Sequence, residues 1–463
     1  MSPRLTPALG LALAALLAGA CQHQVPAPRP VAVVPATMPE ATVSDAPSIG
    51  DAQWAAVFRD DALQGLIRTA LERNDSLQVA AARVLEAQAA LGVIRADEQP
   101  QVNAGASGLS QRTSTAFGFP SRQAHVMQLQ GSAAWELDFW HRLRDATDAA
   151  RAQLLATGWA ERAVRVTVVQ QVADAYFRLR AYDESLEIAT RTLATRRESL
   201  RLTQIREQGG ATSMVDVRQA EQLVSSASLE IVNLRKAMAL EEHLLSVLVG
   251  GLPGPITRGQ PLSEQPHPDE IPAGLPSALL ERRPDIQQAE ALLVAADAQR
   301  AAARTLFFPR ITLTGTGGLQ SAALTALFSG GAGIWSAVAA GTVPVFTAGR
   351  TRAQIAAASA RRDAAAAGYQ QAIHLAFREA ADALVAYRSA RDLRLEQARL
   401  LEAARDSRRL ADLRYQGGAT SYLEVLDADT RLFAAELGAS QARLGELSSL
   451  VSVYRALGGG WQP

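Results

Sequence analysis

The sequence predicts a mainly α-helical protein with a small β part, built as an internal two-fold repeat. The motif Gly-Gly-Ala-Thr-Ser occurs at residues 209–213 and again at 417–421, an offset of 417 − 209 = 208 residues. Each copy interrupts a long run of helical composition that contains no proline. Before each run lie short segments in which apolar and polar residues alternate, as they do in β-strands. Because the motif and its surroundings are duplicated, we expect a duplicated fold.

Composition excludes several classes of function. The 463 residues carry 46 basic and 46 acidic side chains, so the formal net charge is zero. Nucleic acid is not an expected partner, because phosphate binding requires a basic surface. The six histidines are scattered without the spacing of metal ligands, and no serine lies in a nucleophile elbow. We therefore expect no enzyme activity, no cofactor and no metal.

The N-terminus has the pattern of a processed and lipidated segment. Residues 1–20 are predicted to be a lipoprotein signal peptide, with an apolar core at 9–17 that is too short to cross a bilayer. Small residues then precede Cys21, the only cysteine, whose thiol is the expected lipidation site. The alternative is an ordinary signal peptide followed by an incidental cysteine. Gln22 is typical of lipoproteins sorted to the outer membrane, and the proline-rich segment 21–50 is predicted to be an extended tether.

The first repeat is predicted to span residues 51–250. It begins with a helical pattern over residues 61–99, which Pro100 ends. From residue 101 the apolar period changes to two, which predicts a strand. A second strand over residues 127–138 shows the clearest alternation, because one face is apolar and the opposite face is polar. Its apolar face carries Met127, Leu129, Gly131, Ala133, Trp135 and Leu137.

A long helix is predicted beyond Arg142, up to Gln208. Within it, apolar residues alternate in steps of four and three, which is the heptad pattern of a helix packed lengthwise against another. These residues are Val168, Val172, Ala175, Leu179, Tyr182, Leu186, Ala189 and Leu193. A helix of this extent would be about 100 Å long, so it suits a coiled coil or a tall barrel of helices rather than a compact globule. The 209–213 motif then forms a hairpin tip before the next helix.

The second repeat is predicted to span residues 277–463, after a linker over 251–276 that is dense in proline and glycine. Its opening sequence Leu-Glu-Arg at 280–282 matches 71–73 at an offset of 209. The predicted elements are a strand from residue 311 onwards, a strand over 335–345, and a helical stretch over 345–462 that the second Gly-Gly motif interrupts. Each repeat is thus helix, two strands, long helix, tip, helix.

The strands indicate a membrane channel shared between chains. Strands of about ten residues with one apolar face suit an outer-membrane barrel. Four such strands cannot close a water-filled barrel, and open sheet edges cannot face lipid. The economical solution is a ring of several chains, whose lumen continues into a tube of helices. The strand count alone does not set the number of chains in the ring.

Motifs in both repeats resemble those of the TolC-like outer-membrane efflux proteins, and most closely their NodT-type lipoprotein branch. The matching segments are Leu279–Ile286, Phe308–Pro309, Trp135–Asp138, Arg142–Arg144, Arg414–Gly417 and Tyr454–Trp461. The resemblance implies a homotrimer in which each chain gives four strands to a shared outer-membrane β-barrel and long helices to a periplasmic α-barrel. It also implies a lipid-anchored exit duct for small molecules. Its partners would be a periplasmic adaptor protein and an inner-membrane transporter, commonly of the RND class.

The tips hold the candidate functional residues. By resemblance, the periplasmic gate comprises Leu423, Glu424, Asp427 and Arg431 with Asp216 and Gln219 of the first repeat. Adaptor docking is expected at Gly209, Gly210, Thr212, Gly417, Gly418 and Thr420. The alternatives are that the carboxylates only favour helix N-termini through the helix dipole, and that the glycines only serve the turns.

Other functions remain open at this point. A periplasmic adaptor lipoprotein would carry compact β-domains beside a single hairpin. A coiled-coil scaffold would lack alternating strands. The outer-membrane channel of a type I protein secretion system would share the predicted fold. The sequence does not name the exported substrate.

Overall fold

A computed structural model of the chain describes residues 48–117, 120–265, 271 and 278–460. The predicted signal peptide, Cys21 and the tether up to residue 47 lie outside the described residues. By internal contacts the chain divides into two compact units. The first contains residues 84–157 and 289–370. Described residues of the second are 48–83, 158–265, 271, 278–288 and 371–460.

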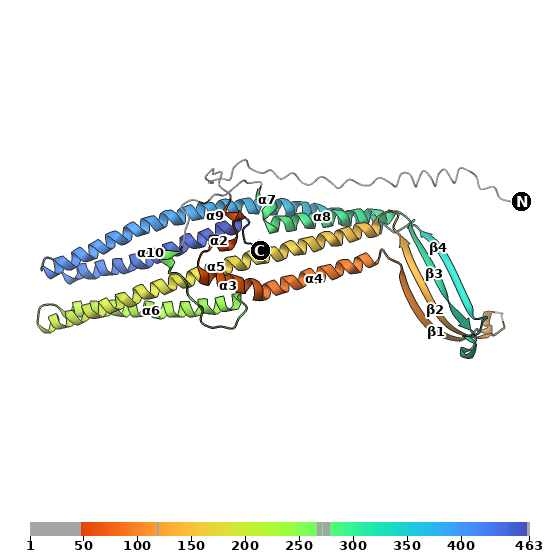
Figure 1. Ribbon diagram of the computed structural model, residues 1–463, viewed down its shortest axis with the longest axis horizontal. Helices are drawn as coiled ribbons and strands as arrows, with labels where there is room; N and C mark the ends of the chain where they lie inside the picture. The colour runs from red at the N-terminus through yellow and green to blue at the C-terminus, as the bar shows by residue number, and fades with distance from the viewer. Residues whose placement is uncertain (1–47, 118–119, 266–270, 272–277, 461–463) are drawn as a thin grey trace. The chain divides into compact units, whose positions relative to one another are not determined.

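The sheet in the first unit has four antiparallel strands in the order β1-β2-β3-β4 (Figure 1). Their bounds are β1 Gln101–Arg112, β2 Gln123–Leu137, β3 Arg310–Ser321 and β4 Gly333–Thr342. The register aligns Ala104, Gly131, Gly317 and Trp335 in one row across the sheet. Strand β4 ends before the predicted 345, because Pro344 has no N–H for the ladder.

Helices of matching length recur in both repeats, which confirms the two-fold internal repeat. The long helices α5 and α9 have 67 residues each, and the helices after the tips, α6 and α10, have 35 each. The helices are α2 Trp54–Val57, α3 Asp61–Arg73, α4 Asp75–Ala96, α5 Arg142–Gln208, α6 Met214–Leu248, α7 Ala278–Arg282, α8 Pro284–Arg304, α9 Arg350–Gln416 and α10 Tyr422–Ala456. The second helical stretch therefore begins at residue 350, not at 345.

The range 61–99 is helical over most of its length, as predicted, but the chain breaks at Asn74 into α3 and α4, and α4 ends at Ala96. Asn74 has extended backbone angles, and its Oδ1 accepts a hydrogen bond from the Ser76 N–H at 3.0 Å. Its Nδ2 donates to the carbonyl of Leu248 at 2.8 Å, at the end of α6. The Asn74 side chain thus satisfies backbone groups at the start of α4 and at the end of α6. This makes the break at Asn74 more favourable than a continuous helix.

The core of the second unit confirms the predicted heptad seam on α5. Val168, Val172, Ala175 and Leu179 are all at most 2% exposed. They pack in one cluster with apolar residues of α3 and α10, which include Leu63, Ile67, Leu447 and Val451. A long helix buries a continuous apolar stripe by packing against other helices. The apolar stripe of α5 therefore forms the centre of the core of this unit.

Residues 48–50, at the end of the predicted tether, are packed rather than extended. Ile49–Asp51 form a short 3-10 helix, Ser48 is 4% exposed, and Gly50 is buried. A Cβ atom at Gly50 would lie 2.5 Å from the carbonyl oxygen of Leu457. Residues 48–50 therefore belong to the packed part of the chain, because this segment contacts the C-terminal end of α10.

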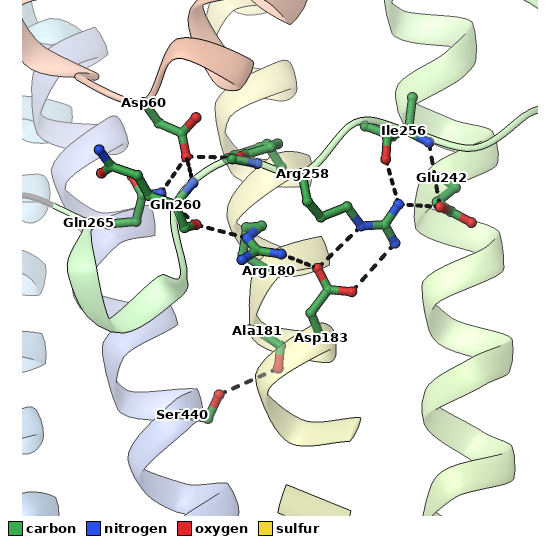
Figure 2. Close-up of polar contacts among 12 residues, drawn as sticks. Asp60, Arg180, Ala181, Asp183, Glu242, Ile256, Arg258, Gln260, Gln265 and Ser440 are labelled. Atoms are coloured by element: carbon green, nitrogen blue, oxygen red, sulfur yellow. Dashed lines mark hydrogen bonds and ion pairs between the residues drawn. The ribbon is translucent and has the colours of Figure 1, made fainter. Parts of the chain in front are cut away.

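The linker between the repeats is held by a network of polar contacts (Figure 2). Arg258 forms ion pairs with Asp183 of α5, at 3.3 Å, and with Glu242 of α6. The Gln260 N–H donates to Asp60 Oδ2 at 2.8 Å, and the Gln260 carbonyl accepts from Arg180 Nε at 2.9 Å. The linker thus joins α5, α6 and the N-terminus of α3, which are far apart in the sequence.

Candidate functional site

One face of the four-stranded sheet is apolar. Side chains alternate along each strand, so the register places every second residue of all four strands on the same face. Most of this face consists of Val102, Ala104, Ala106, Gly108, Met127, Leu129, Gly131, Ala133, Trp135, Leu137, Ile311, Leu313, Gly315, Gly317, Leu319, Gly333, Trp335, Ala337, Ala339 and Gly341. Among its polar residues, Ser110 and His125 pair with each other near the end of β1 and the start of β2. It has the composition of a surface that contacts hydrocarbon.

The opposite face of the sheet is rich in amide and hydroxyl side chains. Its polar members are Gln101, Asn103, Ser107, Gln111, Gln128, Gln130, Ser132, Thr312, Thr314, Thr316, Gln320, Ser336 and Thr342. In the described strands, Arg and Glu occur only at or next to strand ends, at Arg112, Glu136 and Arg310. A polar, uncharged face is typical of the wall of a water-filled lumen.

The outer edges of the sheet are open. In the described chain, β1 pairs only with β2, and β4 pairs only with β3. Open edges cannot lie in hydrocarbon, because each unpaired N–H or C=O group there would cost on the order of several kcal/mol. A sheet with an apolar outer face therefore needs further strands from other chains.

The passage from β2 to α5 is fixed by residues of the Trp135–Asp138 motif. Glu136 accepts two hydrogen bonds from Arg142, at 2.9 and 2.7 Å. Asp138 accepts from the backbone N–H groups of Leu143 and Arg144, at 3.1 and 2.9 Å, and so caps the first turn of α5. His141 adopts a φ of +64°, and its counterpart in the second repeat, at 141 + 208, is Gly349 with a φ of +85°.

Both hairpin tips have the same backbone geometry. Gly210 and Gly418 have φ angles of +72° and +70°, a region that glycine enters without steric cost. The N–H of Ala211 donates to the Arg206 carbonyl at 2.8 Å, and the N–H of Ala419 donates to the Arg414 carbonyl at 2.8 Å. These are Schellman caps, which end a helix by satisfying its last carbonyls. The Gly-Gly signal therefore predicted the turns for the correct physical reason.

The helices after the tips begin in different ways. Ser213 and Asp216 form a reciprocal capping box at the start of α6, and Thr212 also donates to Asp216. The hydrogen bond from Thr212 is the main reason that the pKa of Asp216 lies below its usual value of 3.8. Ser421 makes no side-chain cap, whereas Thr420 donates to Glu424. Asp216 is thus engaged in capping α6.

Within one chain, the six predicted gate residues do not form a single cluster of side-chain hydrogen bonds or ion pairs. Asp427 pairs with Arg431 at 3.0 Å, and both side chains are more than half exposed. Glu424 pairs with Arg414 at 3.0 Å. Leu423 is 58% exposed. Gln219 is half-buried on α6.

Sequence reasoning missed a series of polar contacts between α5 and α10. Arg196, which is 3% exposed, binds Asp429 at 2.7 Å, and Ser199 lies 2.7 Å from the Tyr422 hydroxyl. Arg191 binds Glu436 at 2.8 Å. These pairs run antiparallel along the two helices. Polar residues on long helices usually face solvent, and nothing local in the sequence marks these as exceptions. Only the structure shows that they pair with residues more than 200 positions away.

A chain with a two-faced sheet, open sheet edges and long helical hairpins is a subunit of a membrane channel with a helical extension. The sequence profile of the family described as outer membrane efflux protein matches residues 66–251 and 275–459. The chain therefore belongs to the outer membrane efflux protein family.

Individual relatives agree with this membership. The chain is 36% identical over 462 residues to the probable efflux pump outer membrane protein TtgC of a Pseudomonas putida strain, covering 98% of this chain and 95% of that protein. It is 34% identical over 421 residues to the cation efflux system protein CusC of Escherichia coli O6:H1, covering 91% of each. The open state of the MtrE outer membrane channel of Neisseria gonorrhoeae has a TM-score of 0.86 at 31% identity, covering 96% and 99%.

These findings confirm the predicted class and fold. The chain is an outer membrane efflux protein with a TolC-like channel fold, mainly helical with a small sheet and two repeats. The interpretation as a periplasmic adaptor is wrong, because the family match and the channel structures cover both repeats.

Proposed function

We propose that three copies of this chain form the exit duct of a tripartite efflux pump, which exports small molecules passively across the outer membrane. The observation that carries this proposal is the register that separates an apolar from a polar face across four strands with open edges. Three copies give about twelve strands, an even number that closes a barrel. A periplasmic adaptor would bind the tips, and an inner-membrane transporter of the RND class would supply the energy.

Gene deletion tests this function. We expect a bacterial strain that lacks the gene for this protein to become more sensitive to toxic small molecules. A copy of the gene on a plasmid is expected to restore resistance. The relatives' names include an efflux pump and a cation efflux system, so the substrate class is tested with both organic compounds and metal ions. Unchanged sensitivity, together with loss of a secreted protein, would favour the type I secretion channel instead.

A lipid anchor at Cys21 belongs to the same proposal. Its support is the short apolar segment followed by small residues and the only cysteine of the sequence. Labelled palmitate is expected to enter the parent protein and not the Cys21→Ala variant. A mature N-terminus at any residue other than Cys21 would contradict the assignment.

The gate proposal rests on the exposed pair of Asp427 with Arg431 near the second tip. In a trimer, three copies of Asp427 would form a ring of like charges, which Arg431 neutralises. Like charges about 4 Å apart repel by roughly 1 kcal/mol in water, a five-fold effect on an opening equilibrium. We therefore expect Arg431→Gln to raise the open probability of single channels in planar bilayers, and Asp427→Asn to lower it.

A matched control for this gate is Asp406→Asn, which removes another exposed and paired carboxylate, 3.0 Å from Arg409 on α9. It is expected to leave both conductance and trimer yield unchanged. Enlarging Leu423 to tryptophan tests a steric contribution separately. If Arg431→Gln and Asp427→Asn both behaved as the parent protein does, the charged gate would be ruled out.

A further inference from the structure

A hollow in the first unit touches four helices at once. It has a volume of about 730 Å³ and is lined by one stretch each of α4, α5, α8 and α9, together with Leu306 in the 3-10 turn after α8. Most of its lining side chains are alanines. Its polar members are Gln153, Gln299, Gln354 and Arg361.

The two repeats contribute equivalent positions to this hollow. Gln153 and Arg361 are related by the offset of 208, and so are Ala149 and Ala357. The long helices α5 and α9 therefore line the hollow with equivalent residues of the two repeats. We infer that this hollow lies on the concave side of the layer that the four helices form, where side chains of all four converge.

This concave side faces the lumen if the proposed trimer is correct, and the inference rests on that proposal. Helix α4 leads into β1, β2 leads into α5, α8 leads into β3, and β4 leads into α9 (Figure 1). The helices therefore continue the order of the strands. When three such layers close into a tube, their concave sides surround the axis.

The charge of the hollow comes from one residue. Arg361 is the only charged side chain among the residues that line it. It is exposed and has no ion pair within the described part of the chain. The next residue, Arg362, is instead paired with Asp297 at 3.2 Å. Three copies of Arg361 would thus place unneutralised positive charge in the lumen, and its field would extend over a screening length of about 8 Å.

We propose that the hollow is a subsite for organic anions in the duct, and that Arg361 determines its selectivity. The alanine walls accommodate an apolar body, and the guanidinium group binds a carboxylate, sulfonate or phosphate. The glutamine amides supply further hydrogen bonds around the hollow. Charge complementarity selects the anion, since no acidic side chain lines the hollow.

The first test is the ratio of anion to cation permeability, measured from reversal potentials of the full-length protein in planar bilayers under a potassium chloride gradient. Arg361→Gln is expected to lower this ratio at least about twofold, and Arg361→Glu to lower it further. Arg352→Gln is the matched control. Arg352 is also exposed on α9, but it lies nine residues away, about two and a half turns, and so on the opposite side of the helix. This control should match the parent.

The second test uses 8-anilino-1-naphthalenesulfonate as an amphiphilic anion that blocks the current. The concentration needed for block should rise roughly tenfold in Arg361→Gln, as expected for the loss of one hydrogen bond to a charged group. An unchanged permeability ratio and unchanged block, in channels that conduct normally, would overturn the inference and leave the duct function intact. A lower trimer yield with an unchanged ratio would show that another copy fills the hollow. Absence of channels in the parent would overturn the proposed duct as well.

Discussion

Replacing Asp60 by alanine is expected to lower the free energy of unfolding of the second unit by about 3–5 kcal/mol, because it leaves several buried donors without an acceptor. Asp60 is 0% exposed. Its carboxylate accepts from the Tyr176 hydroxyl at 2.8 Å, the Gln265 amide at 2.7 Å and the Gln260 N–H at 2.8 Å. It also caps α3 by accepting from the backbone of Ala62.

The same site gives a pH dependence. Burial raises the pKa of Asp60, but the hydrogen bonds from Gln265, Tyr176 and the backbone outweigh burial and hold the pKa below 3.8. A carboxyl whose pKa is lower in the folded state contributes its full stability above the unfolded pKa. That contribution is lost as the pH falls through the lower, folded pKa. The Asp60→Ala variant should therefore lose less stability than the parent between about pH 4 and pH 2.

Asp61→Ala is the matched control, because Asp61 is the exposed next residue in the first turn of α3. It should change the unfolding free energy by less than about 0.5 kcal/mol. The measurement is urea unfolding in detergent, followed by far-ultraviolet circular dichroism of the helices. Equal urea midpoints for the Asp60→Ala and Asp61→Ala variants would show that the hydrogen bonds to Asp60 do not stabilise this unit.

Replacing Ala337 by arginine is expected to prevent membrane insertion, because Ala337 lies on the apolar face in the middle of β4. A cationic side chain facing lipid at the bilayer midplane costs about 2–4 kcal/mol in each copy. The adjacent Ser336 lies on the polar face, where its hydroxyl is 2.7 Å from that of Thr316. Ser336→Arg should therefore insert and change only the conductance.

Fractionation of outer membranes, with resistance to extraction by urea, measures insertion of these two variants. The predicted result is a large loss for Ala337→Arg and near-parent insertion for Ser336→Arg. The two residues are neighbours in sequence, and both are exposed in the single chain. Strand propensity at the two positions would therefore not explain a difference in insertion between the two arginine variants. Equal insertion of the two variants would mean that the two faces of the sheet do not contact different surroundings.

The sequence predicted the strands and tips well because their signals are local. Alternation along β2 defines its faces within a few residues, and the two adjacent glycines of each tip supply the left-handed position that a Schellman cap requires. The break at Asn74 was missed because its second partner, Leu248, is 174 residues away. Likewise, nothing near Arg196 indicates that Asp429, 233 residues along the chain, neutralises it.

Candidate gate residues were harder to predict than the fold. The sequence placed Asp216 and Asp427 in one class, but Asp216 caps α6 while Asp427 forms an exposed pair. A carboxylate that caps a helix and one that forms an exposed ion pair have the same local sequence signal, since both lie near helix N-termini. Only side-chain geometry separates the two roles.

The most direct measurement is native mass spectrometry of the full-length protein extracted from outer membranes in mild detergent. One chain supplies four strands with two open edges, so the complex is expected to contain three copies. A mass of three chains, with loss of the complex in Ala337→Arg but not in Ser336→Arg, is the predicted result. A stable monomer in the membrane extract would contradict the shared barrel.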